Sequence, residues 1–199
     1  MKLTGWDVLD EARTMLVTAV AGVTVEGLEL ATPCAEWNVA QVLQHAALDQ
    51  IVWASALSGT AMPSENPFAP SGQLNGAPLA YVSQALDSSV SAWAAIGTEL
   101  VPTPLPQGKM AASQAAGAAA LDAAIHAWDI AVATGQGSPL TPQLAKLLHP
   151  VATGIVEPLR QYGAYAAALT PAPGADPAAA LLCYLGRQPV QPSVSHDRG

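Results

Sequence analysis

Apolar residues recur at helical spacing along most of the chain and predict four principal helices. The first stripe repeats at intervals of three and four residues and consists of Leu9, Ala12, Leu16, Ala19, Val20 and Val23. One apolar face of this kind is typical of an amphipathic helix packed on a core. Similar patterns predict helices that begin at Asn38 and that span 79–96 and 113–133, whereas 26–31 is less periodic.

Polar residues and a glycine mark where these helices begin and end. Thr4 and Asp7 have the spacing of a capping box before the first helix, and Asn38 with Gln41 repeats this spacing at the second. Gly135 stands where a C′ glycine would end the fourth helix. The ends of the helices are therefore predicted by local chemistry as well as by periodicity.

The remaining segments differ in length and composition. Residues 59–78 are rich in Gly, Pro, Ser and Asn and predict a long loop that could cover a functional site. Prolines 102, 104 and 106 predict a stiff connector, and no convincing strand or repeat is found. Further helices are expected from Thr141-Pro142, over 152–168, and from Asp176-Pro177 to about Gly186.

Composition agrees with a helical protein that has a large core. Hydrophobic residues make up 51% of the chain and charged residues 11%, so disorder of the whole is excluded. Ala is the main apolar residue and the best helix former. A chain of 199 residues fits one domain, expected over 1–187 with a flexible tail over 188–199. The predicted fold class is all-α, a four-helix bundle with additional short C-terminal helices.

Charge and hydropathy exclude two classes of partner. The net charge is −8 and the chain has only seven Lys and Arg residues, too few for a groove that follows nucleic-acid phosphates. No apolar run reaches the ~18–20 residues of a membrane-spanning helix, and charges at 7–13 interrupt any signal peptide. We expect a soluble, cytoplasmic protein with no nucleic-acid or membrane partner, whose sparsely charged surface could support a homodimer.

Asp122 and His126 are the first candidates for a metal site. They lie four residues apart on the predicted fourth helix, so they share one face about one turn apart. Their apolar neighbours indicate a buried pair, and a buried unpaired carboxylate is costly. His45 interrupts the apolar face of another helix. Two imidazoles and one carboxylate would leave a position open for water or substrate. Spacing alone also allows a hydrogen-bonded core histidine and an ordinary i, i+4 pair.

Three further residues are weaker candidates. Asp129 follows His126 by three residues and could accept a hydrogen bond from His126 or His45. The favoured interpretation is a solvated helix residue. His149 precedes a proline near a helix end, and His196 lies in the predicted tail.

The two cysteines predict no disulfide. Cys34 and Cys183 belong to no CxxC motif, so reduced thiols are expected in a cytoplasmic protein. Packing beside Trp37 is the expected role of Cys34, with a reactive thiol or a soft metal ligand as alternatives. Nucleophile elbows, Walker A loops and dinucleotide-binding glycine motifs are absent from the sequence.

Three motifs in order carry a family resemblance. The first is Thr32-Pro33-Cys34-x-x-Trp37-x-Val39, followed by His45. The second is Asp122-x-x-x-His126-Ala127-Trp128-Asp129-Ile130-Ala131-x-Ala133-Thr134-Gly135-Gln136, and the third is Asp176-Pro177 with Leu185-Gly186-Arg187. Over about residues 5–190 the chain resembles actinobacterial proteins of the DinB-like superfamily, those related to the N-terminal domain of mycothiol-dependent maleylpyruvate isomerase.

The resemblance implies a bundle that binds a divalent metal ion through His45, Asp122 and His126. Zinc is the expected ion, with nickel, iron and manganese as alternatives. The third ligand is a His in DinB proteins proper and a Glu in the isomerase. Asp122 is one methylene shorter than Glu, so it must lie closer to the ion or bind it through water.

The resemblance also implies a function without assigning catalytic residues. The metal would activate a low-molecular-weight, mycothiol-like thiol, so we expect a thiol-dependent transferase or hydrolase that acts on a small electrophile. The chain lacks the isomerase's separate C-terminal domain, and maleylpyruvate isomerisation is not expected. The alternatives are a non-catalytic metal- or ligand-binding module, such as a stress-response protein, and a vestigial site.

Overall fold

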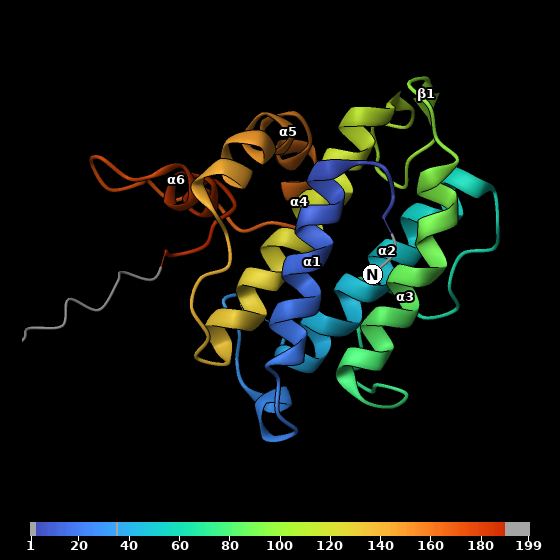
Figure 1. Cartoon of the computed structure of the whole chain (residues 1–199). Helices are drawn as coiled ribbons and strands as arrows, with labels where there is room; N and C mark the ends of the chain where they lie inside the picture. The colour runs from blue at the N-terminus through green and yellow to red at the C-terminus, as the bar shows by residue number, and fades with distance from the viewer. Residues whose placement is uncertain (1–2, 35, 190–199) are drawn as a thin grey trace, which may run out of the picture.

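Four long helices lie side by side and form the body of the protein (Figure 1). They are α1 (Asp7–Ala21), α2 (Val39–Ser58), α3 (Pro78–Ala94) and α4 (Ala112–Ala133). The computed structural model describes residues 3–34 and 36–189. Two further helices, α5 (Pro142–Arg160) and α6 (Pro177–Tyr184), follow the bundle. This arrangement confirms the predicted all-α class with additional C-terminal helices.

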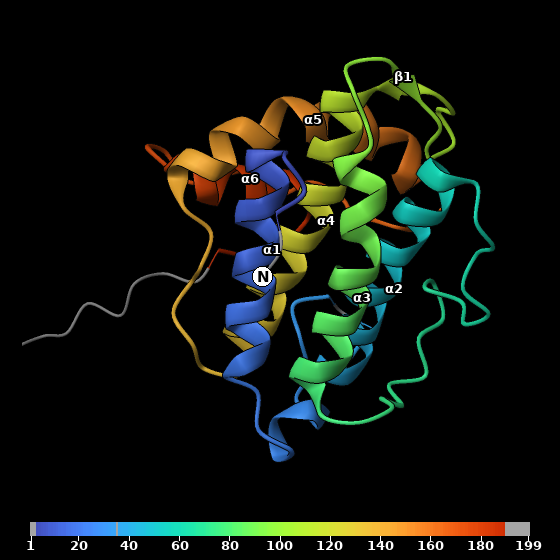
Figure 2. The same cartoon turned by 45° about the vertical axis from the view of Figure 1, so that its right-hand side comes forward.

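The long loop after α2 sets the direction of the helices. Figure 2 shows residues 59–77 running back along the outside of the bundle, so α2 and α3 point the same way while α1 and α4 point the other way. α4 packs against α1, α2 and α5. Such a long crossover is one of the known ways to connect a four-helix bundle.

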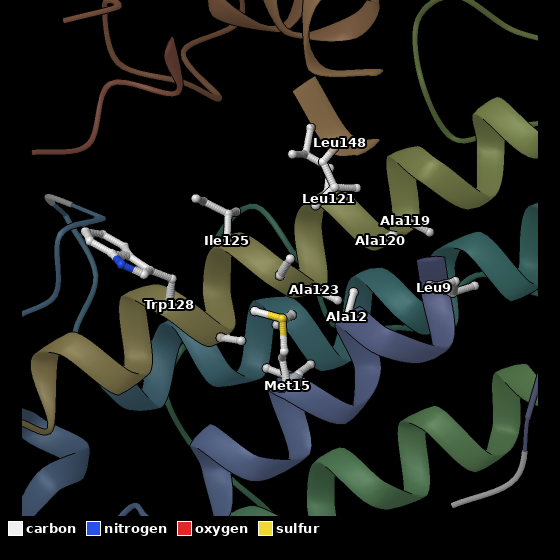
Figure 3. Packing of buried hydrophobic residues seen from close by; sticks show 14 of the residues in the cluster. Leu9, Ala12, Met15, Ala119, Ala120, Leu121, Ala123, Ile125, Trp128 and Leu148 are labelled. Carbon is white, nitrogen blue, oxygen red and sulfur yellow. The ribbon is translucent and has the colours of Figure 1, made fainter. Parts of the chain in front are cut away.

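Small side chains place α4 at the centre of the core. Figure 3 shows Ala119, Ala120 and Ala123 of α4 on the side that faces Ala12 and Met15 of α1, and all five side chains are buried. Contrary to the expectation that no apolar run has this length, α4, alone among the described helices, is long and apolar enough to span a membrane, but 89% of that window is buried inside the protein. An apolar helix that is buried on all sides is expected for a core helix.

Several predicted helix ends are confirmed. The Asn38–Gln41 capping box is present at α2. Gly135 follows α4 with φ of 72°, and the Gln136 amide donates to the Ala131 carbonyl at 2.8 Å, as in a Schellman motif. The Gln136 side chain also donates to the Ala19 carbonyl at 2.9 Å. The end of α4 is thereby tied to the end of α1.

The predicted capping box at the first helix is wrong. Trp6 is the N-cap and makes no side-chain cap hydrogen bond. The Thr4 backbone amide and hydroxyl instead donate to Asp10 Oδ1 at 2.9 and 2.8 Å. A carboxylate one turn further along α1 therefore takes the role predicted for Asp7.

Two other expectations are corrected. The proline-rich connector joins two short antiparallel strands, β1 (Leu100–Val101) and β2 (Met110–Ala111), whereas no strand was expected.

α5 runs without a break through Pro150 and ends at Arg160, not at 168. Its apolar face packs on α4, and tertiary packing can outweigh the one helical hydrogen bond that an internal proline removes. A short 3₁₀ helix, η1 (Glu26–Glu29), occupies part of the less periodic segment.

The domain limits stay predictions. Residues 190–199 of the expected tail, with His196, lie outside the described residues.

Candidate metal centre

Helices α2 and α4 bring the three predicted ligands together. Asp122 Oδ1 lies 3.3 Å from His45 Nε2 and 3.4 Å from His126 Nε2. The two imidazole rings meet nearly edge to face, with centroids 4.8 Å apart. One ligand atom from each of the three residues falls within a 4.8 Å cluster. His45, Asp122 and His126 are therefore close enough to share one ion after small side-chain adjustments.

The donor set and its burial fit a divalent cation. His45 and His126 are 7% and 5% exposed, and the Asp122 side chain is 16% exposed. Asp122 Oδ2 is buried and has no hydrogen-bond partner among the described residues. Buried polar atoms are nearly always paired, and a cation would satisfy this oxygen. Imidazole nitrogen and carboxylate oxygen are ligands that zinc and its neighbours accept.

The second nitrogen of each histidine is already fixed. His45 Nδ1 donates to the Pro67 carbonyl at 2.7 Å, and His126 Nδ1 donates to Asp129 Oδ2 at 3.0 Å. A hydrogen on each Nδ1 leaves the lone pair of each Nε2 directed at Asp122. This is the tautomer that a metal-binding histidine needs, with the outer hydrogen bond that orients such ligands.

Asp129 and Arg187 form a buried pair behind His126. Arg187 Nε and Nη2 donate to the two oxygens of Asp129 at 3.1 and 2.8 Å, and Asp129 is fully buried. The solvated interpretation of Asp129 is therefore wrong, and its hydrogen bond is to His126. A Cβ on Gly186 would lie 2.8 Å from Ala166 Cβ, so only glycine fits the close crossing that leads Arg187 to this position.

Charge and burial act against each other at the centre. Burial alone would raise the pKa of Asp122, but the charges of His126 and His45 outweigh it and the pKa is lowered. Burial would lower the pKa of His126, but Asp122 outweighs it and raises the pKa to about 10. Burial also opposes ionisation of Asp129, yet Arg187 holds its pKa below the ordinary value. In the absence of a metal ion, the positive charge of protonated His126 therefore balances the negative charge of the Asp122 carboxylate.

The predicted loop is attached to the helix that carries His45. Gln41 Nε2 donates to the Pro70 carbonyl at 3.1 Å, and the Gly72 amide donates to Gln44 Oε1 at 2.8 Å. Phe68 lies on this loop with its ring centroid 6.1 Å from that of His45. The loop thus contributes to the surroundings of His45 through a backbone carbonyl and an aromatic ring.

Trp37 and Cys34 lie on the turn that precedes α2. The Trp37 ring centroid is 4.8 Å from that of His45. Cys34 forms a second metal-capable group with His126 and Asp129, again within 4.8 Å. Burial raises the pKa of the Cys34 thiol, although His126 and Arg187 oppose the change. Cys34 therefore lies beside the centre as a neutral thiol.

The other weaker candidates lie apart from the three ligands. Cys183 is a free, buried thiol, and Cys34 is free as well. The His149 ring lies against Tyr184, with centroids 5.5 Å apart. Neither Cys183 nor His149 belongs to a metal-capable group within the described ranges.

Two residues of the site, Arg187 and Asp49, are not predicted by their local sequence. Arg187 ends the third motif of the family resemblance, but nothing in its local sequence connects it to Asp129. Asp49 lies four residues after His45 on α2, the same spacing that identified Asp122 and His126. Its Oδ2 atom is buried without a partner among the described residues. Burial, and then the charge of Asp122, raise the pKa of Asp49 well above its ordinary value.

Comparisons with known proteins agree with this arrangement. Residues 9–131 match the family model of the mycothiol maleylpyruvate isomerase N-terminal domain, a region that includes α2, α3, most of α1 and α4, and the three candidate ligands. Two uncharacterized proteins of Mycobacterium tuberculosis, from strains CDC 1551 / Oshkosh and ATCC 25618 / H37Rv, are each 30% identical over 188 residues. Each match covers 88% of this chain and 93% of the relative. No solved structure matches the chain significantly.

Proposed function

The chain belongs to the family of the mycothiol maleylpyruvate isomerase N-terminal domain, a DinB-like helical bundle, and we propose that it binds a divalent metal ion through His45, Asp122 and His126. The observation that carries this proposal is the position of Asp122 Oδ1, 3.3 and 3.4 Å from the two Nε2 atoms. The unpartnered Asp122 Oδ2 supports it. In the metal-free centre a proton on His126 provides the positive charge that an ion would supply.

Zinc is the proposed ion. Three protein ligands with two imidazoles and one carboxylate are typical of catalytic zinc sites. Nickel, iron and manganese accept the same ligands. The short side chain of Asp122 is compatible with this role, because its Oδ1 already lies near both histidine nitrogens.

We propose that the centre serves a thiol-dependent transferase or hydrolase that acts on a small electrophile. A bound divalent ion would lower the pKa of a thiol or water at its open position. The family name supports a mycothiol-like thiol as co-substrate. Asp129 and Arg187 would hold His126 in place, while Trp37 and Phe68 supply apolar surface near His45.

A non-catalytic metal-binding module is the second candidate. Cys34 lies within 4.8 Å of ligand atoms of His126 and Asp129. If its thiolate completed the coordination, no position would remain open, as in structural zinc sites.

Metal analysis of purified protein tests the proposal. We expect wild type loaded with Zn²⁺ and then desalted to retain about one equivalent. His45→Ala should lose it while its helical circular dichroism is retained, and His149→Ala is the matched control that should retain it. Equal retention by wild type and His45→Ala, or none by wild type, would contradict the proposal.

A further inference from the structure

Two aromatic side chains, Trp37 and Phe68, lie beside the proposed ligand His45. The Trp37 ring centroid is 4.8 Å from that of His45 with the planes inclined by 44°, and the Phe68 centroid is 6.1 Å away at 53°. Separations of about 4.5–7 Å are those of interacting aromatic rings. The two rings come from separate segments, the turn before α2 and the loop at 59–77. A molecule that reaches an ion held by His45 would therefore lie close to both rings.

Phe68 is exposed although the loop around it is fixed. Its side chain is 69% exposed, whereas Pro67 and Pro70 on either side of it are buried. The Pro67 carbonyl accepts the His45 Nδ1 hydrogen at 2.7 Å, and the Phe68 amide donates to Asn66 Oδ1 at 2.9 Å. Aromatic side chains commonly line small-molecule sites. The loop thus holds its one aromatic ring where a ligand at the centre can cover it.

The cation behind the centre is already paired. Among the described residues, Arg187 is the one Lys or Arg that donates hydrogen bonds to a residue of the centre. Its donors go to Asp129 and to the Leu185 carbonyl. Carboxylate and phosphate groups are usually recognised by such a cation. Arg187 is therefore not free to bind an anionic substrate.

The segments that carry the two rings disfavour an anion as well. Residues 32–38 and 59–77 contain Glu36 and Glu65 and no Lys or Arg. A divalent ion that holds both the Asp122 carboxylate and a thiolate has no excess positive charge to attract an anion, and the ion itself disfavours a cation. The chemistry around the centre therefore favours an uncharged molecule with an apolar, planar face.

We propose that the small electrophile is an uncharged, planar aromatic molecule that stacks against Trp37 and Phe68. This inference rests on the proposed function and narrows its substrate class. The molecule's π face would pack on the two rings and cover the exposed Phe68 side chain. The hydrogen bond from His45 to Pro67 ties the position of Phe68 to that of the ligand histidine. The aromatic surface and the ion would therefore keep a fixed relation to each other.

Ligand-observed NMR tests this substrate class without measuring activity. The probe is nitrobenzene, added to protein loaded with Co²⁺ or with Zn²⁺, because both ions accept imidazole and carboxylate ligands. Paramagnetic relaxation falls steeply with distance, so faster relaxation of the ring protons with Co²⁺ places the bound probe beside the centre. We expect this result for nitrobenzene. Nitrocyclohexane, which has no aromatic ring, and 4-nitrobenzoate, which is charged, should bind more weakly.

Substitutions at the two rings separate stacking from general apolar contact. Phe68→Leu keeps an apolar side chain but removes the π face, and it should weaken nitrobenzene binding about threefold to tenfold. Phe68→Tyr keeps the ring and should bind like wild type. Trp37→Leu should weaken binding to a similar extent. Leu100→Ala is the matched control, because Leu100 is 67% exposed on β1 and should not affect the probe.

Each outcome supports or overturns the aromatic site. Equal nitrobenzene affinity of wild type and Phe68→Leu, or binding with no added relaxation from Co²⁺, would overturn it. Nitrocyclohexane or 4-nitrobenzoate binding as tightly as nitrobenzene would do the same. If Trp37→Leu does not fold, the exposed position of Phe68 still provides the decisive comparison. Failure of wild type to retain either metal would instead overturn the proposed function itself.

Discussion

Asp129 and Arg187 lie 58 residues apart in the sequence and form a buried, bidentate ion pair directly behind His126. The pair connects the chain after α6 to the central helix α4. The pair also fixes the position of the Asp129 carboxylate, which accepts a hydrogen bond from His126 Nδ1. The orientation of one proposed ligand therefore depends on a residue outside the four-helix bundle.

Loss of Arg187 should destabilise the protein strongly. Arg187→Met would leave the Asp129 carboxylate buried and without its cation, and breaking a buried pair from one side costs about 3–5 kcal/mol. The free energy of unfolding from urea titration measures the effect. Lys146→Met, at an exposed position of α5, should change it by no more than ~0.5 kcal/mol. Equal, small effects of the two substitutions would show that the pair does not support the fold.

The metal-free protein should lose stability as pH rises above neutral. The pKa of His126 is raised to about 10 in the fold, from ~6.5 in an unfolded chain. Protonation of His126 therefore contributes stability that is complete below the lower value and is lost as pH rises through the higher one. Thermal unfolding between pH 6 and about pH 10 should show this decline, and His126→Gln should flatten it. A profile that is the same in both proteins would argue against the His126–Asp122 pair.

Metal affinity should increase with pH. The ion and the proton compete for His126 Nε2, because the imidazole must be neutral to bind a metal. Between ~6.5 and the raised pKa, apparent affinity should rise about tenfold for each pH unit. Competition with a chelator of known pH dependence measures this slope. Affinity that does not depend on pH would mean that the ion binds elsewhere.

Gln44 should restrain the loop over His45. Its side chain accepts a hydrogen bond from Gly72 and donates one to Gln73. Gln44→Ala should cost about 1 kcal/mol per lost bond and increase proteolytic cleavage within 59–77. Gln84→Ala, at an exposed site on α3, is the control. If cleavage rates are equal in the two variants, the loop is held by other contacts.

The sequence predicted features that depend on one helix better than features that depend on several. The i, i+4 spacing joined Asp122 to His126, and local capping chemistry predicted the start of α2. Spacing could not join His45 to them, because that contact depends on how α2 packs against α4. The family resemblance supplied this connection, and the structure places the three side chains together.

The errors and omissions have the same physical origin. The local sequence favours a solvated Asp129, because the residue that covers it, Arg187, lies far along the chain. Thr4 was paired with Asp7 by local spacing, whereas Asp10 on the next turn offers the better acceptor. Asp49 carried a readable signal, its spacing from His45, but the cost of its burial becomes visible only in the folded protein.

X-ray absorption at the metal edge tests the central claim most directly. In the zinc-loaded, thiol-free protein we expect two imidazoles and further nitrogen or oxygen ligands at ~2.0–2.2 Å, with no sulfur near ~2.3 Å. His45→Ala should reduce the imidazole contribution or abolish binding. A spectrum without imidazole scattering, or one with a sulfur ligand that is lost in Cys34→Ser, would contradict an open centre formed by His45, Asp122 and His126.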